Sequence, residues 1–245
     1  MKSTGSRDIR ASACELKFVV DRALGARIRE RVRTLLSPDP YASGPASDEY
    51  HTTTIYFDTA EYAVYRRRGS YRRAKYRVRR YGEGNVVFLE RKLRTPDVLS
   101  KRRSIATIDA LSRLTSESLD AHWPGAWFHE RLLMRRLAPV CQVSYSRTAR
   151  VGMTDYGPIR LTLDDDLAAL AVDTAEFQSA APIPVFEGRT IVEMKFTAAM
   201  PAAFKQIAEE FALESSRVSK YRLGVEGTRN LVPDAPADQG AVSNA

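Results

Sequence analysis

Three copies of the spacing Glu-x-Lys place a carboxylate and an ammonium group on the same side of an extended chain. They occur as Glu15 and Lys17 in "CELKFVV", Glu90 and Lys92 in "FLERK", and Glu193 and Lys195 in "IVEMKF". Successive side chains of a β-strand point to opposite faces, so residues two apart share a face. The chain can therefore gather charged groups on one surface, as phosphate handling by side-chain cations requires.

The stretch "RRAKYRVRRYGEGNVVFLERK", residues 72–92, predicts a β-hairpin with one charged face and one apolar face. Lys75, Arg77 and Arg79 lie on one side of its first strand, whereas Tyr76 and Val78 lie on the other. The turn "YGEGN" supplies two glycines and an asparagine, which suit a tight connection. An antiparallel sheet commonly has one solvated face, so this hairpin alone leaves open an ordinary charged outer surface.

The same alternation recurs in other strand-like segments. "IRLTLDDD" places Arg160, Thr162 and Asp164 on one face, and "VSYSRTAR" places Tyr145 and Arg147 on one side. Solvated faces of ordinary sheets also use Ser, Thr and Gln freely, whereas these faces concentrate Arg, Lys and Glu. The pattern predicts an α+β fold built on one antiparallel β-barrel, with a charged interior and helices packed on the outside.

The order of elements predicts a single domain over residues 12–230, with disordered segments at 1–11 and 231–245. Asp21 is the expected N-cap of a helix from Arg22 to Leu36. The segment "TAEYAVYRRR" after Asp58 reads as a short helix whose arginines could equally be solvated. Further helices are expected over 108–138, with a break at Pro124, and in "AAMPAAFKQIAEEFAL".

Composition indicates an anionic partner. The 245 residues carry a net charge of +8, with a pI near 9.6, and this balance favours nucleic acid, phospholipid or a phosphorylated molecule or polymer. No apolar run approaches the roughly 20 residues that cross a bilayer, and the N-terminus has no hydrophobic signal core. These features predict a cytoplasmic protein.

Several catalytic motifs are absent from the sequence. It contains no GxxxxGK[ST] loop, no strand followed by GxGxxG, no HRD or DFG, and no GxSxG. Cys14 and Cys141 are expected to pack in the core, and His51, His122 and His129 form no ligand pair. The cations alternate with apolar residues and are not interleaved with exposed aromatics, which disfavours a nucleic-acid surface.

A series of short motifs resembles a known family. The order "ELKF", "TTIYFDT", "KYRVRRYG", "FLERK" with "SKRRS", "YSR", "IRLTLD", "VEMKF" and "SKYRLG" is similar to the VTC-type polyphosphate polymerase domain of the triphosphate tunnel metalloenzyme (CYTH-like) superfamily. The resemblance runs from about residue 14 to residue 225. It implies a tunnel of antiparallel strands lined by basic and acidic side chains.

The resemblance also implies roles for individual residues. Triphosphate or polyphosphate contacts are expected from Lys17, Lys75, Arg77, Arg79, Lys92, Lys101, Arg147, Arg160, Lys195 and Lys220. Of these, the catalytic set comprises Lys17, Arg77, Arg79, Lys92, Arg147 and Arg160, together with Glu193. Glu193 matches the metal-binding glutamate of the family, with Glu15 and Glu90 as weaker contributors. Lys220 is expected at the tunnel mouth, where the chain returns to the barrel.

The implied activity is transfer of the γ-phosphate of ATP to a phosphate or polyphosphate end, with Mn²⁺ or Mg²⁺ as cofactor. Relatives that are triphosphatases or cyclases open with Glu-x-Glu-x-Lys, whereas Ala13 occupies the first of those positions here. Loss of one carboxylate favours the polymerase-like branch over two-metal hydrolysis. Two alternatives remain open, namely a triphosphatase that uses the same tunnel and a non-catalytic polyphosphate-binding module.

Overall fold

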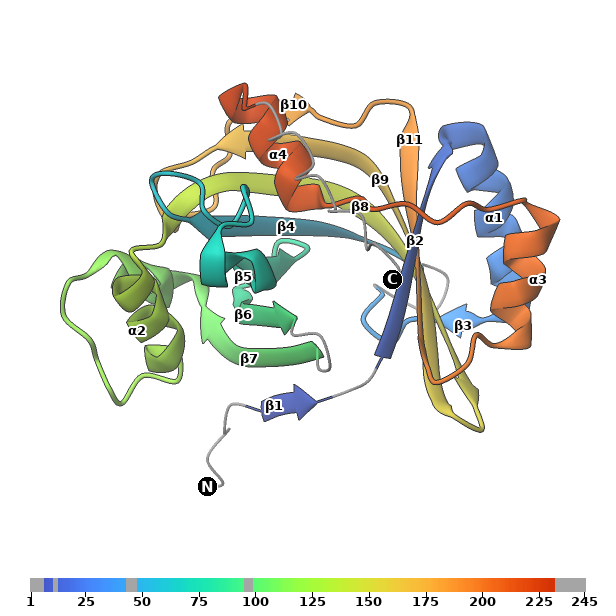
Figure 1. Cartoon of the computed structure of the whole chain (residues 1–245), viewed down its shortest axis with the longest axis horizontal. Coiled ribbons are helices and arrows are strands. Elements are labelled where there is room, and N and C mark those ends of the chain that lie inside the picture. The colour runs from blue at the N-terminus through green and yellow to red at the C-terminus, as the bar shows by residue number, and fades with distance from the viewer. Residues whose placement is uncertain (1–6, 11–12, 43–47, 95–98, 232–245) are drawn as a thin grey trace, which may run out of the picture.

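The computed structural model describes residues 7–10, 13–42, 48–94 and 99–231. In these ranges a long antiparallel sheet curves through the molecule and helices lie on both of its flanks (Figure 1). The strands are β1 (Arg7–Arg10), β2 (Ala13–Asp21), β3 (Ser37–Pro38), β4 (Glu49–Asp58), β5 (Ala74–Tyr81), β6 (Val86–Arg94), β7 (Leu99–Thr107), β8 (Ala138–Thr154), β9 (Gly157–Ala171), β10 (Ile183–Pro184) and β11 (Arg189–Thr197). The α-helices are α1 (Arg22–Leu35), α2 (Ala126–Arg135), α3 (Ala202–Glu210) and α4 (Lys220–Arg229), and the 3-10 helices are η1 (Gly69–Arg73) and η2 (Ile108–Thr115).

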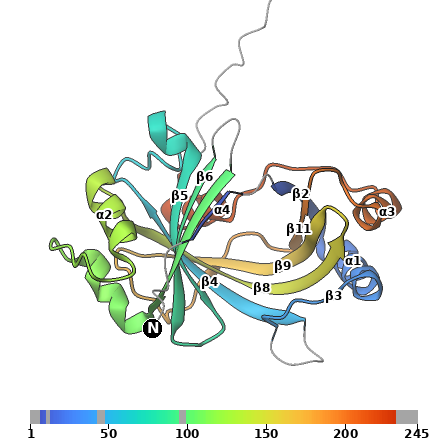
Figure 2. The same cartoon turned by 90° about the horizontal axis from the view of Figure 1, so that it is seen from below.

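The sheet has the order β1-β7-β6-β5-β4-β8-β9-β11-β2, with β3 paired to β8 and β10 paired to β9. Figure 2 shows its bend, since β5 and β6 run steeply across the direction of β8 and β9. This architecture confirms the expected α+β class, with one difference from a closed barrel. Among the described strands, the backbone ladder does not continue from β2 to β1 or β7. Side chains cross the opening instead, because Lys92 Nζ on β6 lies 2.9 Å from Glu15 Oε2 on β2.

The two faces of the sheet differ in character, as the alternation predicts. On the outer face, Tyr76, Val78 and Leu89 are buried in one apolar cluster with Phe128 of α2. A second outer cluster packs Leu161 and Met194 with residues of α1 and α3 such as Ile28 and Phe204. Burying each such side chain contributes about 1.5–3 kcal/mol, so the helices hold the sheet by its apolar face and leave the charged face inward.

Helix α1 begins where the sequence indicates. The Asp21 carboxylate accepts a hydrogen bond from the Leu24 amide at 2.7 Å, which satisfies one of the unpaired donors of the first turn. The helix ends at Leu35, one residue before the expected end. None of the described helices is both long and apolar enough to span a membrane.

The prediction of a short helix after Asp58 is wrong. Residues 60–67 form turns, and the 3-10 helix η1 follows at Gly69–Arg73. The buried Asp58 carboxylate accepts hydrogen bonds from the amides of Thr59, Val64 and Tyr65 at 2.7 to 2.8 Å. Because one side chain satisfies these backbone donors, the segment wraps around Asp58 and does not form a helical ladder.

Two smaller expectations also need correction. Residues 7–10, expected to lack structure, form β1 and pair with β7, while the remaining residues of 1–11 and those of 232–245 lie outside the described ranges. Cys141 is buried as expected, whereas Cys14 is exposed. The Sγ atom of Cys14 lies 3.7 Å from the Ala198 carbonyl oxygen. His129 packs in α2 with a ring nitrogen 2.8 Å from the Ser116 carbonyl oxygen.

Helix α4 packs against the inner face of the sheet. Gly224 allows a close approach, because a Cβ atom there would lie 2.6 Å from Val143 Cγ2 and 3.3 Å from Cys141 Sγ. Tyr221 of the same helix is buried, with its ring 5.1 Å from that of Tyr56, and its hydroxyl donates to Asp58. This helix covers the end of the inner face where β4 ends and places its own N-terminus toward the middle of that face.

We expect Gly224→Ala to destabilise the fold by about 1–3 kcal/mol, because the added methyl group must displace α4 from the sheet. Urea unfolding followed by circular dichroism would measure the change. Gly84→Ala is the matched control, since a Cβ atom there would come no closer than 4.0 Å to its nearest neighbour. Equal stability of the two variants would contradict the close packing of α4.

Candidate functional site

The inner face of the sheet collects the charged residues of seven strands. Pairing places Lys75 beside Lys92 and Lys92 beside Lys101, and in the next row it places Arg77 beside Glu90 and Glu90 beside Arg103. All ten cations that the resemblance implies lie on this face or, for Lys220, at the end of α4 directed toward it. The charged set is Glu15, Lys17, Lys75, Arg77, Arg79, Glu90, Lys92, Lys101, Arg103, Arg147, Arg160, Asp164, Glu193, Lys195 and Lys220.

Glu90 organises one cluster of cations. Its side chain is 1% exposed and accepts from Arg77 at 2.7 Å, from Lys101 at 2.7 Å and from Arg103 at 2.6 Å. Burial works against the ionised form, but Arg77, Arg79, Lys101 and Arg103 outweigh it and hold the pKa of Glu90 well below its ordinary value. One carboxylate therefore fixes three cations, which leaves the cluster strongly positive.

Asp164 organises a second cluster where β8, β9 and α4 meet. Arg147 donates two hydrogen bonds to this fully buried carboxylate, at 2.5 and 2.7 Å, and Lys220 Nζ lies 2.5 Å from it. Burial opposes ionisation, yet Arg147 and Lys220 lower the pKa of Asp164 to about 2. Lys220 is the first residue of α4, which the Ser219 side chain caps, and its ammonium group reaches the inner face at Asp164.

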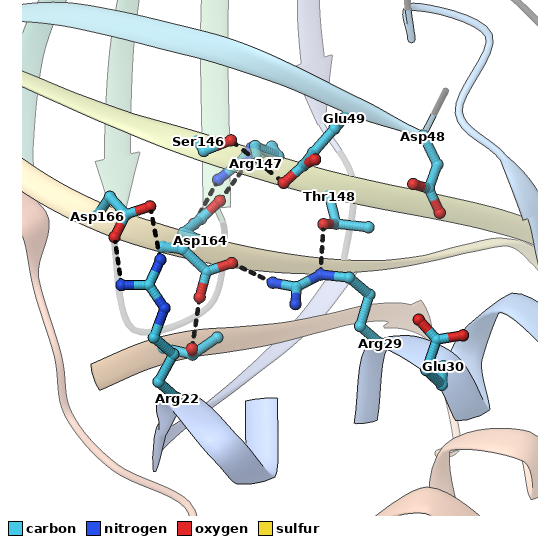
Figure 3. A network of polar contacts seen from close by, with 12 residues as sticks. Arg22, Arg29, Glu30, Asp48, Glu49, Ser146, Arg147, Thr148, Asp164 and Asp166 are labelled. Atoms are coloured by element: carbon cyan, nitrogen blue, oxygen red, sulfur yellow. Dashed lines mark hydrogen bonds and ion pairs between the residues drawn. The ribbon is translucent and has the colours of Figure 1, made fainter. Parts of the chain in front are cut away.

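The surroundings of this cluster tie the sheet to α1 (Figure 3). Arg147 and Asp164 meet between β8 and β9, whereas Arg29 of α1 contacts the same two strands by donating to Thr148 Oγ1 at 2.9 Å and to Asp165. Arg29 is only partly buried. These two adjacent aspartates therefore have different partners. Asp164 binds cations of the inner face, whereas Asp165 binds Arg29 of α1, the helix that covers the outer face.

Glu193 and Glu15 form the third cluster. Lys17 Nζ lies between them, 3.4 Å from Glu193 and 3.2 Å from Glu15, and Lys195 Nζ lies 2.5 Å from Glu193. Burial and the neighbouring Glu193 both oppose ionisation of Glu15, but Lys92 and the other lysines lower its pKa to about 2. Burial opposes ionisation of Glu193 too, and Lys195 and Lys17 hold its pKa well below the ordinary value. Both carboxylates are thus charged at neutral pH.

Two arginines do not contact the carboxylates of these three clusters. Arg160 contacts Asp39 at 2.7 Å and the Tyr50 hydroxyl at 2.7 Å. Arg79 is 5% exposed and has no carboxylate partner among the described residues, since its contacts are Thr54 Oγ1 at 3.2 Å and the ring of Tyr81. Glu90 acts on Arg79 only without contact and already pairs with Arg77, Lys101 and Arg103, so the position of Arg79 favours a bound anion.

The lysines at one end of the inner face repel one another. Burial, together with the nearby charges of Lys17, Lys92 and Arg77, lowers the pKa of Lys75 to about 7. Burial and the neighbouring arginines Arg77 and Arg103 lower the pKa of Lys101 to about 8 against the opposing effect of Glu90. Lys75 Nζ has the Ser219 hydroxyl 2.9 Å away as its neutral partner. An anion placed here would restore full charge to these lysines.

Comparison with family models identifies the family of this chain. The model of the VTC domain matches residues 12–228, which is most of the chain. The chain belongs to the VTC domain family. A search among curated proteins finds no match.

Solved structures resemble this VTC domain in fold. A candidate adenylate cyclase from Bacillus halodurans is 14% identical with a TM-score of 0.54, over 86% of this chain and 95% of that one. A candidate adenylyl cyclase from Hippeastrum, described as having a dominant triphosphatase activity, is 12% identical with a TM-score of 0.47, over 92% and 98% of the two chains. The likeness to the Bacillus structure shows that the VTC domain shares the tunnel-type fold.

The residues of the VTC domain suit a metal that is shared with a substrate. Nowhere in the described ranges do three or more His, Cys, Asp or Glu side chains converge as a complete metal cage. Glu193 and Glu15 offer two ionised carboxylates, and the buried Thr162 hydroxyl, paired across the ladder with Glu193, has no hydrogen-bond partner in the described structure. Mg²⁺ commonly binds one or two carboxylates together with substrate phosphates, and this donor set fits that arrangement.

Some members of the site were missed by sequence reasoning. Arg103 could have been found, because it lies two residues after Lys101 and shares its face. Asp39 and Tyr50, the partners of Arg160, carry no sequence signal because the fold alone brings these two residues against β9. The sequence places Tyr145 on the face of Arg147, but not the contact of Lys220 with its ring at 4.9 Å.

We expect Asp164→Asn to lower the free energy of unfolding by about 3 kcal/mol at pH 7, because Arg147 and Lys220 lose their shared counter-ion in a buried place. The Asp164 contribution is present above the ordinary pKa of 3.8 and is lost as pH falls toward about 2. The difference between variant and wild type, measured by urea unfolding, should therefore shrink at low pH.

The control for this substitution is Glu83→Gln, whose side chain is 80% exposed in its pair with Arg80. We expect this variant to differ little from wild type. A small, pH-independent effect of Asp164→Asn would show that the carboxylate does not hold the inner-face cations together.

Proposed function

We propose that this VTC domain is a metal-dependent polyphosphate polymerase that transfers the γ-phosphate of ATP to the end of a phosphate or polyphosphate chain. The observation that supports it most is the excess of cations over carboxylates on the inner face, above all the buried Arg79, which has no direct carboxylate contact in the described structure. Such an excess is costly in a region of low dielectric unless a polyanion is bound. Membership of the VTC family is consistent with that ligand.

Different cations serve different parts of the substrate. Guanidinium groups grip phosphate oxygens in a directed, often bidentate way, and Arg77, Arg79 and Arg147 are held in place by neighbours on the sheet. Lysines supply compact positive charge without a fixed geometry. The row formed by Lys75, Lys92 and Lys101 follows one end of the inner face, and it would hold successive phosphates of a chain.

The transfer itself demands positioning and charge neutralisation. A terminal oxygen of the acceptor phosphate forms a new bond to the γ-phosphorus of ATP, and the bond from that phosphorus to the bridging oxygen breaks, which releases ADP. The transition state is loose, with charge on the transferred oxygens, so no covalent enzyme intermediate is required. The arginines of the inner face would keep donor and acceptor in line and stabilise this charge.

Glu193 and Glu15 are the residues we propose to hold a divalent cation, Mn²⁺ or Mg²⁺, with Glu90 excluded by its three cation partners. When bound, the ion would polarise the transferred phosphoryl group. Because Lys17 now lies between the two glutamates, it would move toward a phosphate oxygen as the carboxylates change partner.

Incubation of the purified protein with ATP and Mn²⁺ or Mg²⁺, followed by electrophoresis and staining, tests the proposal. A ladder of polyphosphate with matching release of ADP supports polymerisation. Free phosphate without a ladder would replace the proposal with a triphosphatase that uses water as acceptor. Binding of polyphosphate without either product would leave a non-catalytic binding module.

We expect Glu193→Gln to keep the fold and most nucleotide binding but to reduce turnover at least about 100-fold, because the amide keeps the shape and loses the charge that binds the metal. Turnover would be followed by ADP release at saturating metal. Glu209→Gln on the exposed surface of α3 is the control. Turnover of Glu193→Gln close to that of wild type would remove Glu193 from the mechanism.

Triphosphate affinity should fall as pH rises from about 6.5 to 8.5, since the free protein loses protons from Lys75 and Lys101 while a bound anion favours their charged forms. Lys75→Arg should flatten this dependence, because arginine stays protonated. Lys205→Arg on exposed α3 should keep it. Titration calorimetry provides the affinities, and the titration of the ligand itself is common to all three proteins. The same pH dependence in Lys75→Arg would mean that Lys75 does not contact the anion.

A further inference from the structure

The segment between β4 and the end of β5 carries more positive charge than the proposed reaction uses. Residues 62–82, which lie between Glu61 and Glu83, contain nine Lys or Arg and no Asp or Glu. Arg67, Arg68 and Arg72 of this segment are exposed and lie outside the inner face. Like charges gathered on a surface repel one another, so a cluster without acidic neighbours in its own segment suggests an anionic ligand.

These arginines adjoin one end of the inner face. Arg67 lies near enough to Lys75 for its charge to act on that lysine, and Lys75 begins the row that continues through Lys92 to Lys101. Figure 2 shows η1, in turquoise, at the start of β5 on the side of the molecule away from α1 and α3. The positive charge therefore continues from the inner face outward around the start of β5.

The surface beside η1 is hollowed and basic. A hollow of about 500 Å³ is lined by Gly69, Ser70, Arg72, Arg73, Leu93 and Arg135, with no acidic residue among them. Arg135 donates to Ser70 Oγ at 3.1 Å and stacks over the Tyr71 ring at 4.8 Å, which fixes its guanidinium. A guanidinium fixed in this way beside a basic hollow is suited to bind a phosphate oxygen.

We propose that this outer arginine patch, defined as Arg67, Arg68, Arg72, Arg73 and Arg135, binds the part of a polyphosphate chain that extends beyond the inner face. The inference rests on the proposed function and adds a second contact region for long chains. A polyphosphate presents an anionic group at every unit, so one chain can follow the lysine row and reach the patch. Aromatic stacking platforms for nucleic-acid bases are not part of the patch, because Arg135 covers the Tyr71 ring.

The test compares long-chain polyphosphate with inorganic triphosphate. In the variant Arg67→Gln/Arg68→Gln/Arg72→Gln, three exposed side chains lose their charge. We expect triphosphate affinity within about twofold of wild type and long-chain affinity at least about fivefold weaker, because only the long ligand occupies both regions. The salt dependence of long-chain binding should also become shallower. Fluorescence anisotropy with labelled polyphosphate and calorimetry with triphosphate provide the two affinities.

The matched control is Arg27→Gln/Arg189→Gln/Lys205→Gln, which removes the same charge from exposed positions on α1, β11 and α3. It should bind long chains nearly as wild type does. An equal loss in the control, or a parallel loss of triphosphate affinity in the patch variant, would overturn the proposal, because net charge or the general field would then explain the effect. Unchanged long-chain affinity in the patch variant would overturn it directly.

Two further outcomes separate this inference from the proposed function. If wild type binds long chains through the patch but fails to bind triphosphate, the patch stands and the inner-face proposal fails. If a single-stranded RNA of equal charge binds as tightly as polyphosphate and weakens as much in the patch variant, the assignment of the patch to polyphosphate is wrong.

Discussion

Buried carboxylates that each hold several cations are the interaction on which the rest of this structure depends. Glu90, Asp164 and the pair Glu193 and Glu15 are distributed over the sheet, and each lies among more positive groups than it can neutralise. Without these carboxylates the cations would repel one another and turn toward solvent. With them, the cations stay inside at fixed positions and remain short of counter-charge. The inner face therefore keeps an excess of positive charge that a bound polyanion would neutralise.

The same ion pairs explain how the sheet keeps its shape. The described ladder is open between β2 and its far edge, so Lys92 and Glu15 link strands that no backbone hydrogen bonds join. Lys220 likewise connects α4 to β9 through its ion pair with Asp164. The groups that we propose to bind a polyanion are therefore also the groups that link the strands and α4. Under that proposal, binding of the polyanion would be coupled to the rigidity of this VTC domain.

Much of this arrangement could be read from the sequence, because alternation in strands is local. Arg77 and Tyr76 fall on opposite faces whatever the partner strands are, so the inward cations and the outward apolar residues were predictable. The turns around Asp58 were not, since a single buried carboxylate replaces the helical ladder there. Nor was α4, whose first residue Lys220 belongs to a helix that only a glycine at position 224 allows to reach the sheet. Contacts between distant segments, such as Asp39 with Arg160, leave no mark in either segment.

The pairing of β2 with β11 has a consequence for biosynthesis. Glu15 and Lys17 are translated before every described element except β1, whereas their partner strand and α4 are translated only after almost all of the others. During vectorial synthesis β2 must wait as an unpaired strand, with its apolar side uncovered, until the chain returns to it. Long-range strand pairing of this kind is slow to form. The surface that we propose to bind a polyanion is thus completed late, and under that proposal a nascent chain could not hold a polyanion with its full set of cations before nearly the whole domain has emerged.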